Sequence, residues 1–325
     1  MSTATTEPPR APTPAPARRR ATRGDGRLAT LLSNPWGKPR FLVLTTWLYM
    51  AWAIVPVAIA ILFSFNAGRS RSAWQGFSFE WWWGNPTLSV FHDSIYTDAL
   101  RHSVVLAALD MAIATPLGVL LALGLARWRG RGSGASNSLM LVPLVTPEIV
   151  MAVSLLIVFT QLSLVPFSLI HLGTTAQTVG QVTFSVSYVV VIVRGRLASI
   201  GGHYEEAARD LGATPVQALR LVLIPLLMPA IIASLLIVFA LSIDDFVVTQ
   251  YMSSTAGTTT VPMLMYSTAR GGTTTPALNA VATIMVVVTL GGVALAYIVY
   301  TALGRRTSDT GNVSALRELS GLEAA

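Results

Sequence analysis

Four carboxylates lie inside stretches of sequence that are otherwise apolar. They are Asp110, Glu148, Asp244 and Asp245, and no Lys or Arg falls within the same stretches. In a bilayer each acid costs about 2.5 to 3.5 kcal/mol at the centre of a span, or roughly 10 kcal/mol for the four together. Acids without basic partners favour a wet cavity that carries a cation. For each acid two alternatives stay open: a partner such as Arg, Ser or Thr at a helix interface, or a bound proton.

The adjacent pair Asp244 and Asp245 stands late in its apolar stretch. Successive residues of a helix point about 100° apart, so we expect only one of the two to line a pathway. The other would address a neighbouring helix or the outer mouth. Prolines in these stretches would loosen the helices and free carbonyl groups to line a cavity or allow bending; they are Pro143, Pro147, Pro225 and Pro229.

Other kinds of site chemistry find little support. The chain has no cysteine, which excludes a disulfide, a thiolate nucleophile and a Cys-ligated metal. Its four histidines are scattered without a metal-binding spacing, and the phosphate-loop pattern G-x4-G-K-[ST] does not occur. We therefore expect no catalytic residue, no metal and no bound cofactor. If ATP drives the protein, another subunit must supply the ATPase.

Composition indicates an integral membrane protein. Apolar residues make up 53% of the 325 residues and charged ones 11%, against about 25% charged in soluble domains. We predict an all-α fold with six transmembrane helices, at residues 41–65, 102–126, 138–162, 174–193, 225–249 and 278–303. Arg305 and Arg306 end the sixth span.

The two ends of the chain differ from this six-span domain, 39–304. Residues 1–38 are rich in Pro, Ala, Thr and Arg, and predict a disordered basic tail. A signal peptide is the alternative, but the first apolar stretch runs for 25 uncharged residues without an A-x-A site, so it should remain as an anchor. Residues 305–325 form a C-terminal tail.

The basic residues predict the orientation. The net charge of +7 does not indicate nucleic-acid binding, because the basic residues lie at the edges of the apolar stretches. With the N-terminus in the cytoplasm, 18 of the 22 Lys and Arg residues fall on the inner side. This positive-inside bias places both termini in the cytoplasm.

Aromatic residues crowd the segment 66–97 between the first two spans, among them Trp81, Trp82 and Trp83. Such crowding is typical of a membrane–water interface, so the segment should lie along the outer surface in contact with lipid. A sugar-binding aromatic platform is the alternative.

A polar loop at 203–225 separates the fourth and fifth spans. Its glutamates Glu205 and Glu206 would begin a short helix, with negative charge at the positive end of the helix dipole. Gly212 would end or bend that helix. Thr214 would cap a second helix, with Pro215 at its first position. The loop should therefore form a rigid knob of two short helices joined at a glycine.

The same loop carries the spacing E-A-A-x3-G-x9-I-x-L-P, with Val222 for Ile and Ile224 for Leu. It resembles the signature loop of ABC importer permeases, and the resemblance implies a coupling helix seated in a cleft of an ATPase subunit. An ordinary amphipathic loop is the alternative. The residues expected to couple to the ATPase are Glu205, Glu206, Ala207, Ala208, Asp210, Gly212, Ala213 and Pro225.

A narrower resemblance lies in the acidic stretches 147–152 and 241–248, and in 278–283 at the start of the last span. They are similar to the inner-membrane permeases of spermidine/putrescine ABC importers, most closely the C-type subunit. The similarity covers about residues 41 to 303. Glu148 stands where the family pattern has Asp, which keeps the charge but lengthens its reach.

The resemblance implies a type I ABC importer transmembrane domain in the plasma membrane of a prokaryote. Its partners would be a second permease subunit, two copies of an ATPase that uses ATP and Mg, and an extracytoplasmic polyamine-binding protein. The substrate pathway would use Asp244, Asp245, Glu148 and Asp110. Alternatives are the same machine for another solute, such as ferric iron or an organic anion, and a proton-coupled secondary transporter.

Overall fold

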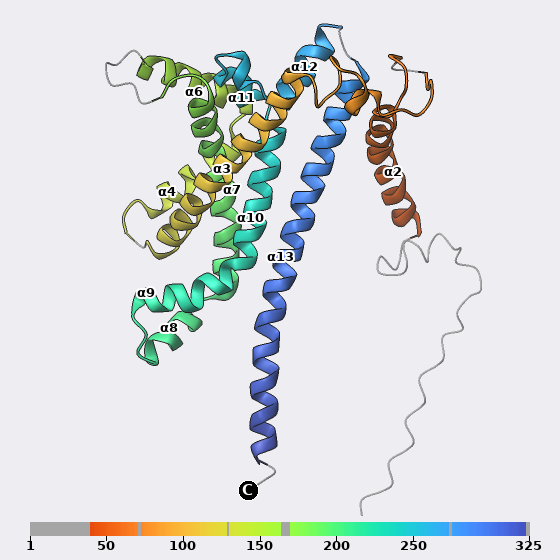
Figure 1. Cartoon of the computed structure of the whole chain (residues 1–325). Helices are drawn as coiled ribbons and strands as arrows, with labels where there is room; N and C mark the ends of the chain where they lie inside the picture. Colours follow the sequence, from red (N-terminus) through yellow and green to blue (C-terminus); the bar gives the residue numbers. More distant parts are fainter. Residues whose placement is uncertain (1–39, 71–72, 129, 164–169, 273–274, 323–325) are drawn as a thin grey trace, which may run out of the picture. The chain divides into compact units, whose positions relative to one another are not determined.

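The computed structural model describes residues 40–70, 73–128, 130–163, 170–272 and 275–322 (Figure 1). Within these ranges the protein is almost wholly helical, which confirms the all-α prediction. The tail predicted at 1–38 lies outside the described residues. The chain divides at Val57 into two units, so the first helix, α2 (Arg40–Phe63), is considered by itself.

Five described helices are long and apolar enough to cross a membrane. They are α2, α3 (Ser94–Arg127), α7 (Thr174–Ile200), α10 (Ile224–Asp244, with preceding turns from Pro215) and α13 (Pro276–Leu322). A sixth span is formed if α4 (Ser133–Leu139) and α5 (Val142–Val145) are joined to α6 (Glu148–Ser163), across a bend of 107°. The described residues therefore contain five candidate spans, or six if the bent pair is one broken span, as the predicted six-helix fold requires.

The break in this third span follows from its sequence. Thr146 precedes Pro147 and has an extended backbone, with φ −70° and ψ 130°. The proline ring disfavours the helical conformation for the residue before it. The helix therefore stops at Val145 and restarts at Glu148.

Helices α3, α7 and α10 pack into the centre of the bundle. Their buried side chains form one cluster that includes Ala114, Val189 and Leu227. At Gly118 of α3, an added Cβ would lie only 2.5 Å from the Cβ of Val189 in α7. The two helices approach this closely because the glycine has no side chain.

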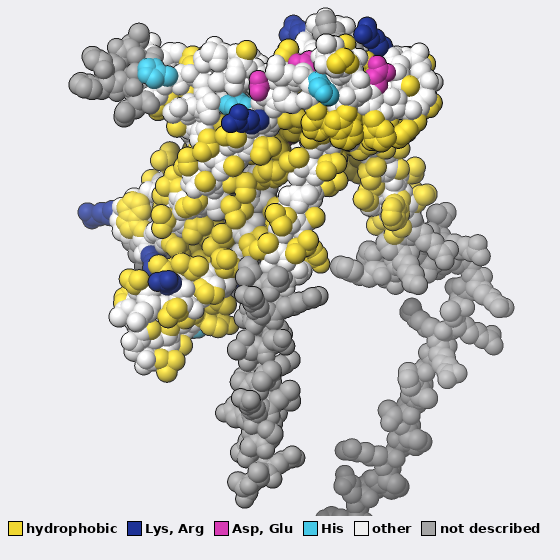
Figure 2. Space-filling view, in the orientation of Figure 1, with side chains coloured by type: hydrophobic (Ala, Val, Ile, Leu, Met, Phe, Trp, Pro, Cys, Tyr) yellow, Lys and Arg dark blue, Asp and Glu magenta, His cyan; other side chains and the backbone are white. Residues whose placement is uncertain are grey.

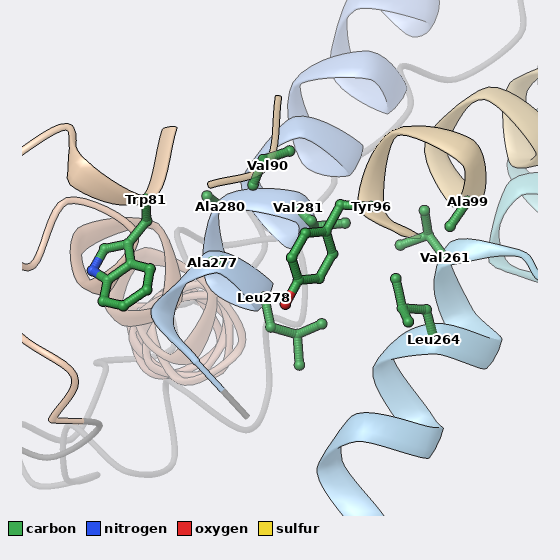
Figure 3. Close-up of a cluster of buried hydrophobic side chains, with 10 residues drawn as sticks. All are labelled: Trp81, Val90, Tyr96, Ala99, Val261, Leu264, Ala277, Leu278, Ala280 and Val281. Atoms are coloured by element: carbon green, nitrogen blue, oxygen red, sulfur yellow. The ribbon is translucent and has the colours of Figure 1, made fainter. Parts of the chain in front are cut away.

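A second cluster of buried apolar side chains joins the segment between α2 and α3 to residues 261–281 (Figure 3). Side chains from the π-helix η1 (Glu80–Gly84), from α3, from α12 (Val261–Arg270) and from the start of α13 meet there. The indole N–H of buried Trp81 donates to the Asn66 carbonyl at 2.8 Å. Nearby rings such as Phe77 and Trp83 are exposed. That they contact the membrane interface stays a prediction.

Two of the helices, α7 and α13, extend further than the predicted spans. α7 continues seven residues past Val193 to Ile200, and α13 continues past Arg305 to Leu322. Arg194 donates to the Asn137 amide oxygen at 2.8 Å, and Arg196 to the Leu226 carbonyl at 3.2 Å. A basic residue marks where a helix leaves hydrocarbon, not where it ends, since its backbone bonds can continue in water. In Figure 2 apolar side chains cover much of the described surface between groups of charged residues.

The close contact between α3 and α7 gives a test of the packing. Gly118→Ala should destabilise the protein by about 1 to 3 kcal/mol because the new methyl group overlaps Val189. Gly124→Ala in the same helix is the control, since nothing lies within 4 Å of its added Cβ; it should stabilise by up to about 1 kcal/mol through helix propensity. Thermal unfolding in detergent measures both. Equal effects of the two changes would contradict the close packing.

Candidate functional site

The acid pair lies where helix α10 ends. Asp244 is the last residue of α10, and Asp245 has an extended backbone with φ −64° and ψ 119°. The carboxylate of Asp245 accepts the backbone N–H of Val248 at 3.2 Å and that of Thr249 at 3.0 Å. These bonds begin the next short helix, α11 (Val247–Met252). Asp245, just before the N-cap residue Phe246, therefore holds the first turn of α11 after the break.

A cavity of about 460 Å³ opens beside this break. Three of the four predicted acids line it, namely Glu148, Asp244 and Asp245, with the rings of Phe184, Tyr188 and Phe246. The bend between α5 and α6 brings Glu148 to the cavity, because Glu148 is the first residue after the bend. Both aspartates border the cavity, but the helix assumed to continue through them is broken after Asp244. That only one of the two lines a substrate pathway stays a prediction.

The three acids differ in how many hydrogen bonds their carboxyl groups already accept from the protein. Asp245 is 5% exposed, and its carboxylate also accepts the side-chain N–H of Gln181 at 3.0 Å. The Glu148 carboxyl is exposed and interacts with that of Asp245. Asp244 is exposed, and within the described part of the chain no hydrogen bond or ion pair engages it. Asp244 and Glu148 are therefore the acids that are open to a ligand.

A buried polar stripe on α7 supports the site. Gln177, Gln181 and Ser185 are spaced by four residues, so they share one helix face, and all three are fully buried. Gln181 donates to the Ser242 carbonyl at 3.2 Å and accepts the Ser242 hydroxyl at 2.6 Å. Sequence reasoning missed this stripe because its members are uncharged. Polar residues at a four-residue spacing inside an apolar helix were the available signal.

Asp110 is not brought together with the other acids. It is fully buried in α3 and is not part of the cavity lining. The Ser185 hydroxyl donates to one of its carboxyl oxygens at 2.7 Å, while the other oxygen has no hydrogen-bond partner among the described residues. For Asp110 the structure therefore shows one of the two alternatives to a cation pathway, namely a serine partner at the interface between two helices.

At the other end of α10, the loop 203–225 forms the two short helices expected from the sequence. The first is α8 (His203–Asp210). It is terminated by Gly212, two residues further on, whose φ is +86°. The Gly212 N–H donates to the Arg209 carbonyl at 2.9 Å, and the Ala213 N–H donates to the Ala208 carbonyl at 3.0 Å. This pair of bonds is a Schellman motif. The predicted role of Gly212 as the end of the helix is confirmed.

The second short helix, α9 (Pro215–Gln217), begins with a capping box. The Thr214 hydroxyl accepts the Gln217 N–H at 3.3 Å, and the Gln217 side chain accepts the Thr214 N–H at 2.8 Å. Pro215 occupies the first turn, as predicted. A π-helical turn, η2 (Ala218–Leu223), then leads into α10.

The knob presents an apolar surface. Leu211 is 90% exposed, Val216 71% and Leu221 69%. Glu206, Ala207 and Asp210 are also exposed, whereas Ala208 is buried. Three large apolar side chains exposed within one short loop favour a surface that binds a partner.

The cavity end and the knob lie at opposite ends of the same helices (Figure 1). The N–H of Gly173, just before α7, donates to Met252 of α11 at 2.7 Å, and α7 ends just before α8. The 21 residues of α10 span about 30 Å between the two sites.

Residues 114–309 match the family described as the binding-protein-dependent transport system inner membrane component. The chain belongs to this family. The match contains the knob, the polar stripe on α7 and the three acids of the cavity. As a family member with several apolar helices, the protein is a multi-pass membrane protein.

Individual members of the family show the same relationship. The spermidine/putrescine transport system permease protein PotC of Haemophilus influenzae is 34% identical over 262 residues, covering 80% of this chain and 97% of PotC. PotC of Escherichia coli K12 is 36% identical over 240 residues, covering 74% and 86%. The putrescine transport system permease protein PotI of the same strain is 33% identical over 256 residues, covering 78% and 87%.

The fold is also shared with solved structures. A bacterial ABC transporter involved in the import of the acidic polysaccharide alginate has a TM-score of 0.64 at 15% identity, covering 84% of this chain and 99% of that one. The same kind of transporter in complex with an alginate-bound periplasmic protein has a TM-score of 0.65 at 17% identity, covering 83% and 96%. This confirms the predicted type I ABC importer transmembrane domain.

The positive φ of Gly212 gives a test of the knob. Gly212→Val should loosen the Schellman motif, because a side chain in the left-handed region costs about 1 to 2 kcal/mol. Hydrogen–deuterium exchange of residues 203–217 should rise several-fold, while that of α7 and α10 stays unchanged. Gly212→Asn is the control and should have a smaller effect, because Asn tolerates this conformation. Equal exchange in both variants would contradict the role of backbone strain, since no heavy atom lies within 4 Å of an added Cβ.

Proposed function

We propose that this protein is the membrane-spanning permease subunit of an ATP-driven ABC importer that carries polyamines such as spermidine and putrescine into the cytoplasm. The observation that carries the proposal is the cavity in which three carboxyls and three aromatic rings meet. Its described lining holds no Lys or Arg, so it suits a cation and not an organic anion. The resemblance to the PotC and PotI permeases supports the same substrate class.

The chemistry of the cavity fits a polyamine, which is a flexible chain of methylene groups between ammonium groups. Carboxylates form charge-assisted hydrogen bonds with ammonium groups, and aromatic faces attract cations. Apolar lining residues such as Leu241 and Val247 can contact the methylene groups. The volume of about 460 Å³ lies within the usual range for small-molecule sites.

The three acids have different roles in this proposal. Asp244 and Glu148 contact the ammonium groups, because both are exposed at the cavity. Asp245 holds the helix break in place through the N–H groups of α11 and the Gln181 amide. Two ionised carboxyls as close as Glu148 and Asp245 repel each other, and a cation beside them relieves this repulsion.

The knob supplies the connection to ATP hydrolysis. We place the knob and both termini in the cytoplasm. Each of two ATPase copies binds ATP and Mg, and each holds one coupling helix in a cleft. The exposed residues Leu211 and Val216 suit such a cleft. A second permease subunit completes the pathway, and an extracytoplasmic binding protein delivers the polyamine. This chain itself performs no catalysis.

The exposed acid of the cavity gives the test of the substrate. Asp244→Asn should raise the KM for spermidine uptake about tenfold or more, because a hydrogen bond to a charged group contributes roughly 1.5 to 3 kcal/mol. Asp110→Asn, outside the cavity, should leave the KM nearly unchanged. Uptake of labelled spermidine into proteoliposomes with the partner subunits measures both. An unchanged KM in Asp244→Asn, or competition by ferric iron but not by putrescine, would refute the polyamine pathway.

The knob gives a separate test of the partner. Glu206→Ala should lower the amount of ATPase that copurifies with the protein, because it removes an exposed charge from the proposed docking surface. We expect a severalfold decrease, with normal membrane insertion. Gln250→Ala, exposed at the opposite end of the bundle, is the control. If both variants retain the ATPase like the wild type, Glu206 is not part of the docking surface.

A further inference from the structure

Glu205 of the knob forms two ion pairs, one of which reaches a different helix. A single terminal nitrogen of Arg127, the last residue of α3, lies 2.9 Å from one carboxylate oxygen of Glu205 and 3.0 Å from the other. Arg209, one turn further along α8, lies 2.9 Å from Glu205. The first pair links residues that are 78 positions apart in the sequence. It therefore fastens α8 directly to the end of α3.

Apart from this pair, α8 packs against η2, and only a short connection joins it back to α7. Two glycines, Gly201 and Gly202, separate the helices, and Gly201 has a φ of +72°. An added Cβ at Gly201 would meet only the His203 ring, at 3.8 Å, so no other side chain packs at this point of the turn. The far end of α8 is bounded by Gly212, which also has a positive φ. The Schellman motif and η2 attach α8 on the α10 side, and the Arg127 pair adds an attachment to α3.

The two membrane helices that meet α8, in contrast, are locked together. Gly118 of α3 allows close contact with Val189 of α7, and Ser185 of α7 donates to buried Asp110 of α3 at 2.7 Å. The ends of α3 and α7 must therefore move as one body. The pair Arg127–Glu205 closes a triangle of α3, α7 and α8, so a tilt of α8 away from α3 would break it.

We propose that the ion pair Arg127–Glu205 is a latch that makes α8 move together with α3 and α7, with Arg127 as the positioning residue. The latch rests on the proposed function, because it presumes that an ATPase moves α8. The side chains of Arg127 and Glu205 are 46% and 20% exposed. Ion pairs exposed to this degree contribute little to stability, so loss of the latch should alter force transmission and not folding.

The test measures ATP hydrolysis and polyamine uptake in the same proteoliposomes, which contain the whole complex. Arg127→Gln should lower the number of molecules imported per ATP by about fivefold or more, within the usual range of coupling between sites. The ATPase should still copurify and hydrolyse ATP. Arg127→Lys should restore part of the ratio, because it keeps the charge. Arg131→Gln is the matched control: it removes the same charge from the same loop, and no ion pair of Arg131 is found among the described residues.

A second measurement replaces the ion pair by a covalent link. The chain has no cysteine, so Arg127→Cys with Glu205→Cys introduces only these two thiols. The double variant should be uncoupled as prepared and should regain coupling when a short bifunctional thiol reagent joins the two positions. An uptake-to-ATP ratio that is normal in Arg127→Gln, or one that the cross-link leaves low, would overturn the latch.

The outcomes also separate the latch from the function on which it rests. If the wild-type complex shows no ATP-driven polyamine uptake, the proposed function fails. If the wild type is coupled but Arg127→Gln no longer binds the ATPase, Arg127 belongs to the docking surface and the latch is wrong.

Discussion

The cost of placing carboxyl groups inside a bilayer is the constraint on which this structure depends. An acid in hydrocarbon needs water, a donor or a cation. The protein meets this need by interrupting its helices. α10 ends at Asp244, and the span before α7 breaks ahead of Glu148, so both acids lie at irregular backbone that lines a cavity. Irregular backbone at membrane depth is tolerated where it lines such a space.

Local signals in the sequence were sufficient wherever a single residue determines the backbone. Gly212 ends α8, Thr214 caps α9, and Pro147 breaks the third span, each through conformational preferences that operate within a few residues. The six-helix membrane fold was likewise predictable, because the apolar stretches are long and their charges lie at their ends.

The break at Asp244 could not be predicted in this way. No glycine or proline stands there, and the residues that stabilise it are distant in the sequence. Asp245 is held by Gln181, which lies 64 positions earlier, as well as by the N–H groups of α11. Helical periodicity in the sequence cannot show that hydrogen bonds from Gln181 and from the backbone of α11 to Asp245 stabilise a break in the helix.

This arrangement also explains how a rigid bundle can hold a responsive site. Asp245 already has three donors, so its position is fixed and it gains little from a ligand. Asp244 is the last residue of α10 and has no hydrogen-bond or ion-pair partner among the described residues. A cation that reaches Asp244 therefore gains an interaction that the protein without substrate lacks. Only an interaction that differs between two states can shift the equilibrium between them.

In the proposed importer, Asp244 at one end of α10 therefore responds to substrate. The knob at the other end, about 30 Å away, responds to the ATPase. α10 joins the two ends, beside the α3–α7 pair to which the proposed latch fastens α8.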